Sequence, residues 1–320
     1  MTSPLRIGII GLGDFGREHL AAVRAHDGFT VTAVADSSED RLHSTGESLG
    51  GTELFIDARS LIRSGEVDAV TIVSPSATHL ALVEAAADAG VAVLVEKPVV
   101  TDLREAGRLL ELDPHARIVP AHILRSSAPH VAAHDTLVAR GAPRLGGLSA
   151  RRHRNVDHLT RFPTEDPVFM TMVHDIDLAI WMSRARAVSV RARSFQLREP
   201  TRTDLVFAVV EDSSGRVWDL ASGWLVDGEG PPDRLELYTD AGLLVIQPPD
   251  DDLTGAMSEQ YTHFEAFVRG EAPPRVTVAD AVHGVAIAHA IRESSRRGGR
   301  AVDVPELGGL KRTAGTAREE

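Results

Sequence analysis

A glycine-rich hexapeptide near the start of the chain, "GLGDFG" at 11–16, restricts the fold more than any other feature of the sequence. It follows the apolar run Leu5–Ile10, which is typical of a buried strand, and it opens the helical pattern of Asp14–Ala25. Glycines at this spacing between a strand and a helix are the fingerprint of a dinucleotide-binding unit built on a parallel sheet. The hexapeptide therefore predicts both a fold and a kind of ligand.

Each residue of this turn has a physical role in that prediction. Gly11 permits the tight turn, Gly13 lets the backbone approach a pyrophosphate, and Gly16 lets the helix pack closely on the strand. Asp14 and Phe15, at the start of the helix, are expected to border the same cofactor. The alternative interpretation is a glycine-rich turn that binds nothing.

An acidic residue at the end of the next apolar run supports the cofactor interpretation. Asp36 lies 20 residues beyond Gly16. A carboxylate at this position accepts hydrogen bonds from the adenosine ribose hydroxyls and repels a 2′-phosphate. The pattern thus favours NAD over NADP, although Ser37 and Arg41 could still accommodate a phosphate. We expect Asp36, Ser37 and Arg41 to contact the cofactor.

Short apolar runs alternate with amphipathic stretches over the first 120 residues. Such alternation predicts an α/β fold with a parallel, doubly wound sheet. The predicted strands are Leu5–Ile10, Thr30–Ala35, Ala69–Val73, Val91–Val95 and Ile118–Ala121. We assign residues 1–121 to an N-terminal Rossmann domain.

The pattern changes after about residue 122, where alternating strands punctuated by Gly and Pro indicate an α+β domain with an antiparallel or mixed sheet. We assign residues 122–305 to this second domain and expect 306–320 to be a disordered tail. The predicted helices are about Ala128–Arg140, Asp166–Met182, Ser258–Val268 and Asp280–Arg296. The predicted strands are Val188–Gln196, Leu205–Glu211, Arg216–Ser222, Leu235–Thr239 and Leu243–Ile246, before a last "RAVDV".

The charge balance and the composition exclude several classes of function. The net charge is −12 and no basic stripe offsets it, so nucleic acid and anionic membranes are poor partners. There is no cysteine, which excludes disulfides and thiolate chemistry. We see neither a signal peptide nor an apolar run long enough to span a bilayer. A soluble cytoplasmic protein is expected.

Lys97 is one of only two lysines in a chain that otherwise uses arginine, and it follows the most apolar run of the sequence. Ligands of open α/β sheets bind beyond the carboxyl ends of the strands, where the nicotinamide half of a cofactor should lie. An ammonium in such a cleft can stabilise alkoxide character while a hydride leaves. Residues expected beside the cofactor at this edge are Ser74, Pro75, His79, Glu96 and Lys97. The alternative is a solvated lysine at a strand end.

The motifs "GLGDFG", "SPSATH" (74–79), "EKPVV" (96–100) and "HDID" (174–177), together with Asp36, resemble the glucose–fructose oxidoreductase, inositol dehydrogenase and MocA-like family, abbreviated Gfo/Idh/MocA. The resemblance extends from about residue 5 to about 305, and "EKP" is its most specific motif. It implies a Rossmann domain followed by an α/β domain with an open, mostly antiparallel sheet. It also implies NAD(P)-dependent oxidation or reduction of a ring hydroxyl or carbonyl on a sugar or cyclitol.

His174 is the candidate acid or base, because histidine titrates near neutral pH and alcohol oxidation must release a proton. The family pattern H-x-x-D implies this role for His174, with Asp177 orienting it or binding substrate. Met170 departs from the pattern, since aspartate often stands one turn before the histidine in similar dehydrogenases. A thioether neither orients an imidazole nor accepts a proton. Either Asp175 or Asp177 substitutes for it, or the proton path differs.

Further substrate contacts are expected from residues near these motifs. The stretch "RRHRN" (151–155) concentrates positive charge that could bind an anionic substrate or could form surface ion pairs. No cluster of His, Asp or Glu repeats a metal motif, so no metal is expected. The residues predicted to contact substrate are Lys97, His122, Arg125, Arg152, His174 and Asp175.

The sequence thus favours an NAD(P)-dependent sugar or cyclitol oxidoreductase. Two alternatives stay open, namely a non-catalytic dinucleotide-binding sensor on the same fold and a transient-oxidation glycosidase or epimerase. The open sheet of the second domain also predicts a homo-oligomer, a dimer or a tetramer. The partner of the protein would be a small polyol or sugar.

Overall fold

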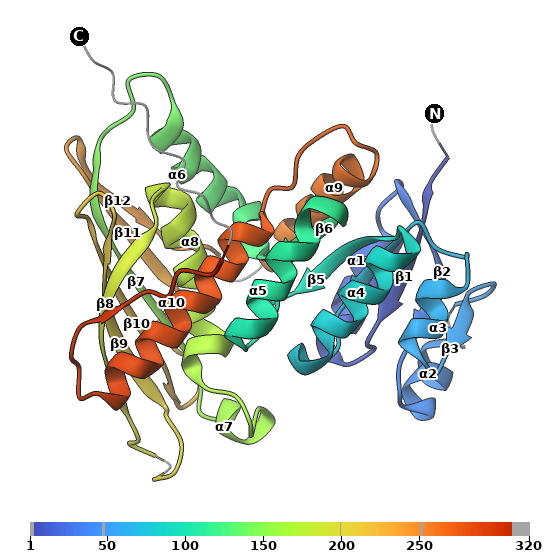
Figure 1. Ribbon diagram of the computed structural model, residues 1–320, viewed down its shortest axis with the longest axis horizontal. Helices are drawn as coiled ribbons and strands as arrows, with labels where there is room; N and C mark the ends of the chain where they lie inside the picture. The colour runs from blue at the N-terminus through green and yellow to red at the C-terminus, as the bar shows by residue number, and fades with distance from the viewer. Residues whose placement is uncertain (1–2, 47–48, 199, 250–251, 309–320) are drawn as a thin grey trace.

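The apolar runs of the N-terminal half form a six-stranded parallel sheet in the computed structural model, which describes residues 3–46, 49–198, 200–249 and 252–308. The strand order is β3-β2-β1-β4-β5-β6, so the order reverses between β1 and β4 (Figure 1). The strands are β1 (Leu5–Ile10), β2 (Phe29–Ala35), β3 (Glu53–Phe55), β4 (Ala69–Ile72), β5 (Ala92–Glu96) and β6 (Ile118–Ala121). Every residue of β4 and β5 is buried, as expected of strands covered on both faces.

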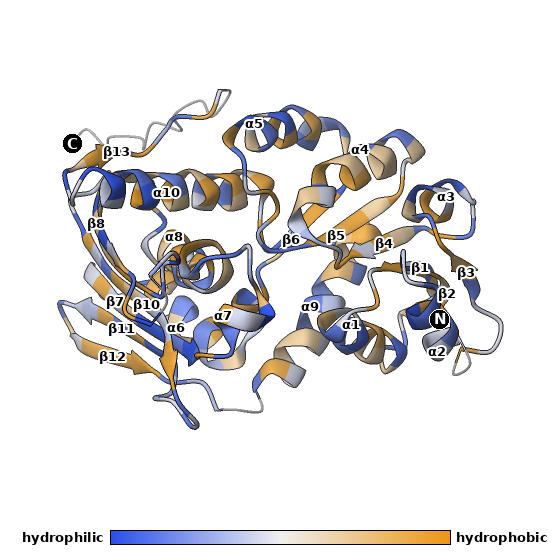
Figure 2. Cartoon of the chain, turned by 90° about the horizontal axis from the view of Figure 1, so that it is seen from below, coloured by the Kyte–Doolittle hydropathy of each residue, from blue (hydrophilic) through white to orange (hydrophobic). Residues whose placement is uncertain are grey.

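Helices cover both faces of this sheet. Helices α3, α4 and α5 lie along one face, and α1 lies on the other (Figure 2). Asp57 caps α3 and Asp102 caps α5, each accepting hydrogen bonds from the first turn. The helices are α1 (Asp14–Arg24), α2 (Glu39–Gly46), α3 (Ala58–Arg63), α4 (His79–Ala89) and α5 (Leu103–Leu112).

The second half of the chain forms a seven-stranded sheet of order β12-β11-β7-β10-β9-β8-β13. Its neighbours pair antiparallel except β7 and β10, which are parallel. The strands are β7 (Leu145–Asn155), β8 (Ala187–Phe195), β9 (Leu205–Asp212), β10 (Val217–Val226), β11 (Arg234–Thr239), β12 (Gly242–Ile246) and β13 (Val302–Asp303). The helices are α6 (Ala128–Val138), α7 (His158–Arg161), α8 (Val173–Ser183), α9 (Asp252–Val268) and α10 (Val278–Arg296).

One face of the second sheet is packed and the other is not. Helix α10 packs along β8 and against α8 on the inner side, and it also reaches α5 of the Rossmann domain (Figure 1). Alternate residues of the strands carry exposed apolar side chains, among them Phe207 and Val209 of β9 and Leu243 and Val245 of β12. The expected homo-oligomer stays a prediction.

The division of the chain at residue 121 does not describe α9, although α9 follows the second sheet in sequence. Its residues Met257, Tyr261 and Phe264 are buried in one apolar cluster with Ile7 and Leu20 of the Rossmann domain. The boundary was placed by chain order, whereas α9 crosses back to cover the sheet beside α1. In the predicted tail at 306–320, residues 309–320 lie outside the described part of the chain, and Leu307 packs against the core.

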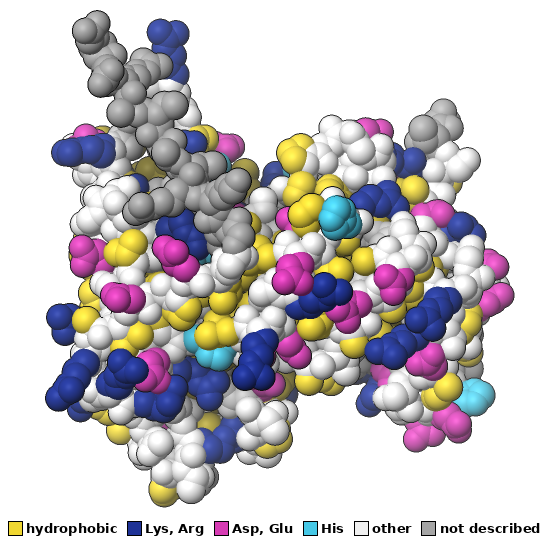
Figure 3. Space-filling view, viewed as in Figure 1, with side chains coloured by type: hydrophobic (Ala, Val, Ile, Leu, Met, Phe, Trp, Pro, Cys, Tyr) yellow, Lys and Arg dark blue, Asp and Glu magenta, His cyan; other side chains and the backbone are white. Residues whose placement is uncertain are grey.

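The surface agrees with a chain of mixed charge. Side chains of both signs are spread over the face shown in Figure 3, with arginines gathered near the C-terminal end of α10. Within the described residues, no helix is long and apolar enough to cross a membrane.

Candidate active site

The turn after β1 has the geometry that its glycines predicted. Gly11 has a φ of +97°, and a Cβ there would lie 2.7 Å from the carbonyl oxygen of Val73. A Cβ at Gly16 would lie 2.0 Å from the carbonyl oxygen of Gly11. A Cβ at Gly13 would meet nothing within 4 Å, because it would project into an open cleft. The turn thus leaves space beside Gly13 for a pyrophosphate at the N-terminus of α1.

Asp36 lies at the end of β2 and is tied to the same turn. Its carboxylate accepts the backbone N–H of Leu12 at 2.7 Å and that of Ser38 at 2.8 Å. Arg41 donates to both of its oxygens, from Nε at 3.0 Å and from a terminal nitrogen at 2.8 Å. Burial alone would raise the pKa of Asp36, but these hydrogen bonds together lower it, so the carboxylate stays ionised.

A cleft of about 1560 Å³ runs from this turn to the second sheet. It is large enough for a dinucleotide and a small substrate. The residues predicted to contact the cofactor all line it: Gly11, Gly13, Asp14, Phe15, Gly16, Asp36, Ser37, Arg41, Ser74, Pro75, His79, Glu96 and Lys97. Of the residues predicted to contact substrate, Lys97, Arg152 and His174 line it. The chain therefore fits a dinucleotide at this edge of the sheet.

Lys97 follows β5, and its ammonium group points across the cleft to the second domain. Nζ donates to the backbone carbonyl oxygen of Met170 at 3.0 Å, and it forms no ion pair within the described part of the chain. Burial is the main cause that lowers the pKa of Lys97, while Glu96 beside it raises that pKa and Arg154 and Arg152 lower it further. The peptide bond between Lys97 and Pro98 is cis.

Met170 contributes through its backbone. The predicted helix over Asp166–Met182 begins instead with a π-helical turn, Val168–Met172, that leads into α8. Asp166 accepts the backbone N–H groups of Val168 and Phe169 at the start of this turn. The position where similar dehydrogenases often carry an aspartate thus supplies a carbonyl oxygen to Lys97.

His174, in the first turn of α8, faces the same cleft. Burial and the neighbouring positive charges of Lys97 and Arg152 hold the pKa of His174 well below its usual range, so the imidazole is neutral at neutral pH. Its Nδ1 is buried and has no hydrogen-bond partner among the described residues. A neutral imidazole beside an ammonium can accept a proton from a substrate hydroxyl.

Arginines of β7 form the wall of the cleft opposite the Rossmann sheet. Arg152 donates to Asp175 of α8 at 2.9 Å and also pairs with Asp233, which holds Arg154 as well. Asp233 lies in the loop between β10 and β11. Arg151 points to the opposite face of the sheet and pairs with Asp219. Because Asp175 is buried behind Arg152, it does not line the cleft.

Asp177 does not orient His174, which corrects the expectation from the H-x-x-D spacing. Both of its oxygens accept hydrogen bonds from Arg125 at 2.7–3.1 Å, and Arg125 also donates to Asp280 at 2.9 Å. Arg125 is 2% exposed, and through it this cluster ties the turn after β6 to α8 and α10. The positive charge of Arg125 attracts Asp177 more strongly than a neutral imidazole can.

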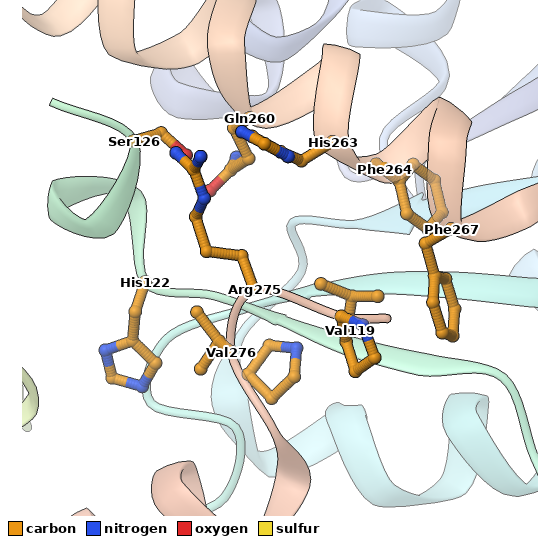
Figure 4. A pocket seen from close by; sticks show the side chains of 11 residues that line it. Val119, His122, Ser126, Gln260, His263, Phe264, Phe267, Arg275 and Val276 are labelled. Atoms are coloured by element: carbon orange, nitrogen blue, oxygen red, sulfur yellow. The ribbon is translucent and has the colours of Figure 1, made fainter. Parts of the chain in front are cut away.

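His122 also lies outside the cleft, contrary to expectation. It borders a separate pocket of about 20 Å³, room for one water molecule, into which Arg275 extends toward Ser126 and Gln260 (Figure 4). The Nδ1 atom of His122 has no hydrogen-bond partner in the described structure, although it lies 3.8 Å from a carboxylate oxygen of Asp177, and burial lowers the pKa of His122.

His79 lines the cleft but is held by backbone. Its Nε2 lies 2.8 Å from the carbonyl oxygen of Ser74, and its Nδ1 lies 3.1 Å from that of Pro98. His79 therefore joins the loop after β4 to the loop after β5, and burial lowers its pKa. Within the described residues, no group of three His, Cys, Asp or Glu is arranged to hold a metal ion.

Sequence reasoning missed a buried polar chain behind Glu96. His19 of α1 lies with Nε2 3.1 Å from Oε1 of Glu96 and Nδ1 2.8 Å from the hydroxyl of Tyr261. That hydroxyl lies 3.1 Å from the hydroxyl of Thr71. Glu96 in turn accepts the backbone N–H of Lys97 at 3.0 Å. The only hint in the sequence was the position of His19, three residues after Gly16 in the first helix. The partners of His19 could not be read from the sequence, because they come from β4, β5 and α9.

Comparison with known proteins agrees with this geometry. A family model described as "oxidoreductase family, NAD-binding Rossmann fold" matches residues 5–117. The chain is 30% identical over 240 residues to UDP-N-acetylglucosamine 3-dehydrogenase of Acidithiobacillus ferrooxidans, covering 73% of this chain and 71% of that protein. It is also 30% identical over 217 residues to inositol 2-dehydrogenase 4 of Saccharopolyspora erythraea, covering 66% of this chain and 64% of that protein, just under two thirds of its length.

A solved structure has the same fold. The crystal structure of scyllo-inositol dehydrogenase from Lactobacillus casei with bound cofactor NAD(H) and scyllo-inositol superposes with a TM-score of 0.84. The superposition covers 94% of this chain and 99% of that chain at 18% sequence identity. At this identity the likeness concerns the fold alone.

Proposed function

Because the chain belongs to the Gfo/Idh/MocA family of NAD-dependent oxidoreductases, we propose that it transfers a hydride between NAD and a ring hydroxyl or carbonyl of a sugar or cyclitol. The observation that carries this proposal is that Lys97 and His174 line the same cleft as the glycine turn and Asp36. The substrate class is taken from the relatives, which are named inositol and UDP-N-acetylglucosamine dehydrogenases.

Bound NAD would supply the hydride acceptor at nicotinamide C4, which is chemistry that no side chain provides. The glycine turn would hold the pyrophosphate, and Asp36 would bind the adenosine ribose. Lys97 and the loop residues after β4 would border the nicotinamide end of the cleft.

His174 would act as the base in the oxidative direction. Its pKa lies well below the usual range, so the imidazole starts unprotonated and can take the hydroxyl proton as the hydride leaves carbon. In the reductive direction the imidazole of His174 would return the proton to the carbonyl oxygen of the substrate. No carboxylate is required at position 170 for this step.

Lys97 would bind and polarise the reacting oxygen. Its ammonium has three hydrogens, of which Met170 accepts one, so two stay available to a substrate oxygen. A positive charge within a partly dry cleft stabilises the alkoxide character that develops during hydride removal. The carbonyl of Met170 fixes the direction of the ammonium without neutralising it.

The proposal is tested by following the absorbance of reduced nicotinamide with a panel of inositols, sugars and nucleotide sugars. We expect net reduction of NAD by at least one polyol, and we expect Lys97→Ala to abolish turnover while NAD affinity changes by less than about threefold. Arg151→Ala is the matched control, because it removes a cation from the outer face of the second sheet. Near-normal turnover by Lys97→Ala would contradict the mechanism, and NAD binding without turnover of any substrate would contradict the activity.

A further inference from the structure

The chain Thr71–Tyr261–His19–Glu96 has no part in the hydride and proton transfers described above, yet it is the most buried polar cluster next to the reacting groups. Thr71, Tyr261 and His19 are 0% exposed and Glu96 is 6% exposed. A polar cluster persists at such burial only when its members satisfy one another. The cluster joins four elements, namely β4, α9, α1 and β5.

Hydrogen-bonding rules fix the direction of this cluster. An ionised carboxylate only accepts, so Glu96 accepts from the backbone N–H of Lys97 and from Nε2–H of His19. In the tautomer with its proton on Nε2, Nδ1 accepts from the hydroxyl of Tyr261. Burial raises the pKa of Tyr261, so its hydroxyl keeps its proton and donates. Thr71 then donates to the oxygen of Tyr261.

We propose that His19 is a positioning residue for the reaction, holding the Glu96 carboxylate beside Lys97, where its negative charge favours the protonated form of Lys97 in the dry cleft. The inference rests on the proposed function, since it gives His19 a role through the ammonium that polarises the substrate. Tyr261 supports His19 by occupying Nδ1, which keeps the donor hydrogen on Nε2.

The charges around Lys97 show why Glu96 matters. Arg152 and Arg154 of β7 are positive, His174 of α8 is neutral, and Glu165, before the π-helical turn, is negative. Burial and the two arginines favour loss of the proton from Lys97, and Glu96 is the largest opposing influence. If Glu96 moved away, Glu165 would still raise the pKa of Lys97, and Asp175 and Asp233 would still pair with the two arginines.

His79 of α4 and His122 after β6 complete the titratable surroundings of Glu96. Burial lowers the pKa of both, so both are neutral at neutral pH, and neither is hydrogen-bonded to Glu96 in the described part of the chain. Within the described residues, His19 is therefore the side chain that donates to this carboxylate.

Two lysines in the whole chain make the test direct. Protein labelled with ¹³C-lysine gives a signal for Lys97 that Lys97→Met identifies, and its titration reports the pKa in solution without any turnover. We expect His19→Leu to lower that pKa by about one unit, the low end of the effect of a nearby opposite charge. The basic limb of kcat/KM should move to lower pH by the same amount.

Conservative variants separate positioning from mere structure. His19→Gln keeps a donor for Glu96 and should restore most of the shift, and Tyr261→Phe should give a smaller shift than His19→Leu. Tyr238→Phe is the control, because Tyr238 is the other tyrosine of the chain and lies exposed on β11. Even if His19→Leu does not fold, His19→Gln and Tyr261→Phe still decide the question.

The outcomes distinguish this inference from the proposed function. An unchanged Lys97 titration in folded His19 and Tyr261 variants overturns the positioning role, even if the enzyme oxidises polyols as proposed. A protein with no polyol activity but a shifted Lys97 titration retains the electrostatic link and rejects the proposed reaction. A shift in both titration and pH profile supports both.

Discussion

Cofactor choice should depend on the carboxylate of Asp36, which the structure shows engaged by four N–H groups, from Leu12, Ser38 and Arg41. We predict that Asp36→Ser reverses the preference of the enzyme from NAD toward NADP. The substitution removes the acceptor of the ribose hydroxyls and the negative charge that repels a 2′-phosphate. It also releases the guanidinium of Arg41, which then can bind that phosphate.

The magnitude follows from the bonds exchanged. A hydrogen bond to a charged group contributes about 1.5–3 kcal/mol, so loss of the ribose contact should weaken NAD binding about ten- to hundredfold. A new pair between Arg41 and the 2′-phosphate should strengthen NADP binding by a similar factor. The ratio of the two dissociation constants should therefore change on the order of a thousandfold.

Calorimetric titration of both cofactors measures this ratio without requiring a substrate. In the double variant with Arg41→Ala, the loss of NAD affinity should persist and the gain for NADP should disappear. Asp68→Ser is the matched control, because Asp68 forms a similar fork with Arg6 at the opposite edge of the sheet. A ratio that stays within about threefold of wild type in Asp36→Ser would refute the reasoning.

Three further predictions concern the turn, the lysine and acid stability. Gly13→Ala should leave thermal unfolding unchanged but weaken NAD binding at least about tenfold. Gly16→Ala should instead destabilise the fold by about 2 kcal/mol or more, because its Cβ would overlap the backbone of Gly11; equal melting temperatures for the two variants would contradict this. Lys97→Met should abolish turnover and raise the free energy of unfolding, measured in urea, by about 1 kcal/mol. Burial lowers the pKa of Lys97, so its positive charge reduces stability at every pH below the pKa of lysine in the unfolded chain; a destabilised variant would contradict this. Burial and Arg186 lower the pKa of His283 to about 3. The stability that the neutral His283 contributes is therefore present above about pH 6.5 and falls by about 1.4 kcal/mol per pH unit from there toward pH 3. In urea unfolding at two pH values, His283→Gln should lose less free energy of unfolding on acidification than the wild type, and an equal loss would exclude this residue.

The sequence predicted the Rossmann half well because its signals are local. Glycine spacing, apolar runs and the acid after β2 each depend on neighbours in the chain. Two of the five predicted strands have the predicted bounds, and the other three differ by one residue at one or both ends. Strand β3 is three residues long and largely exposed, so it left no apolar run to find. Strand β7 was missed because its arginines interrupt the apolar alternation, although one of them, Arg152, is buried and pairs with Asp175 and Asp233.

The residues misplaced at the site share a different cause. A motif after a strand locates a residue at the carboxyl edge, but side-chain direction depends on partners far away in sequence. Arg125 turns inward because Asp177 and Asp280 lie there, 52 and 155 residues further along. Asp177 shares a helix with His174 but faces that buried guanidinium. No spacing rule contains this information, since it arises only when α8 and α10 pack together.

Met170 connects these observations. With a carboxylate at that position, Lys97 would have an opposite charge on the substrate side of the cleft, and its proton would be secured there. The structure offers a neutral carbonyl instead, which directs the ammonium but contributes no full charge to hold the proton. The requirement for a negative charge then falls on the other side of Lys97, on Glu96. A carboxylate that is 6% exposed needs hydrogen-bond donors, and His19 provides one from the helix that begins at the glycine turn. The departure at Met170 is therefore compatible with catalysis because the charge that stabilises Lys97 lies behind it rather than in front.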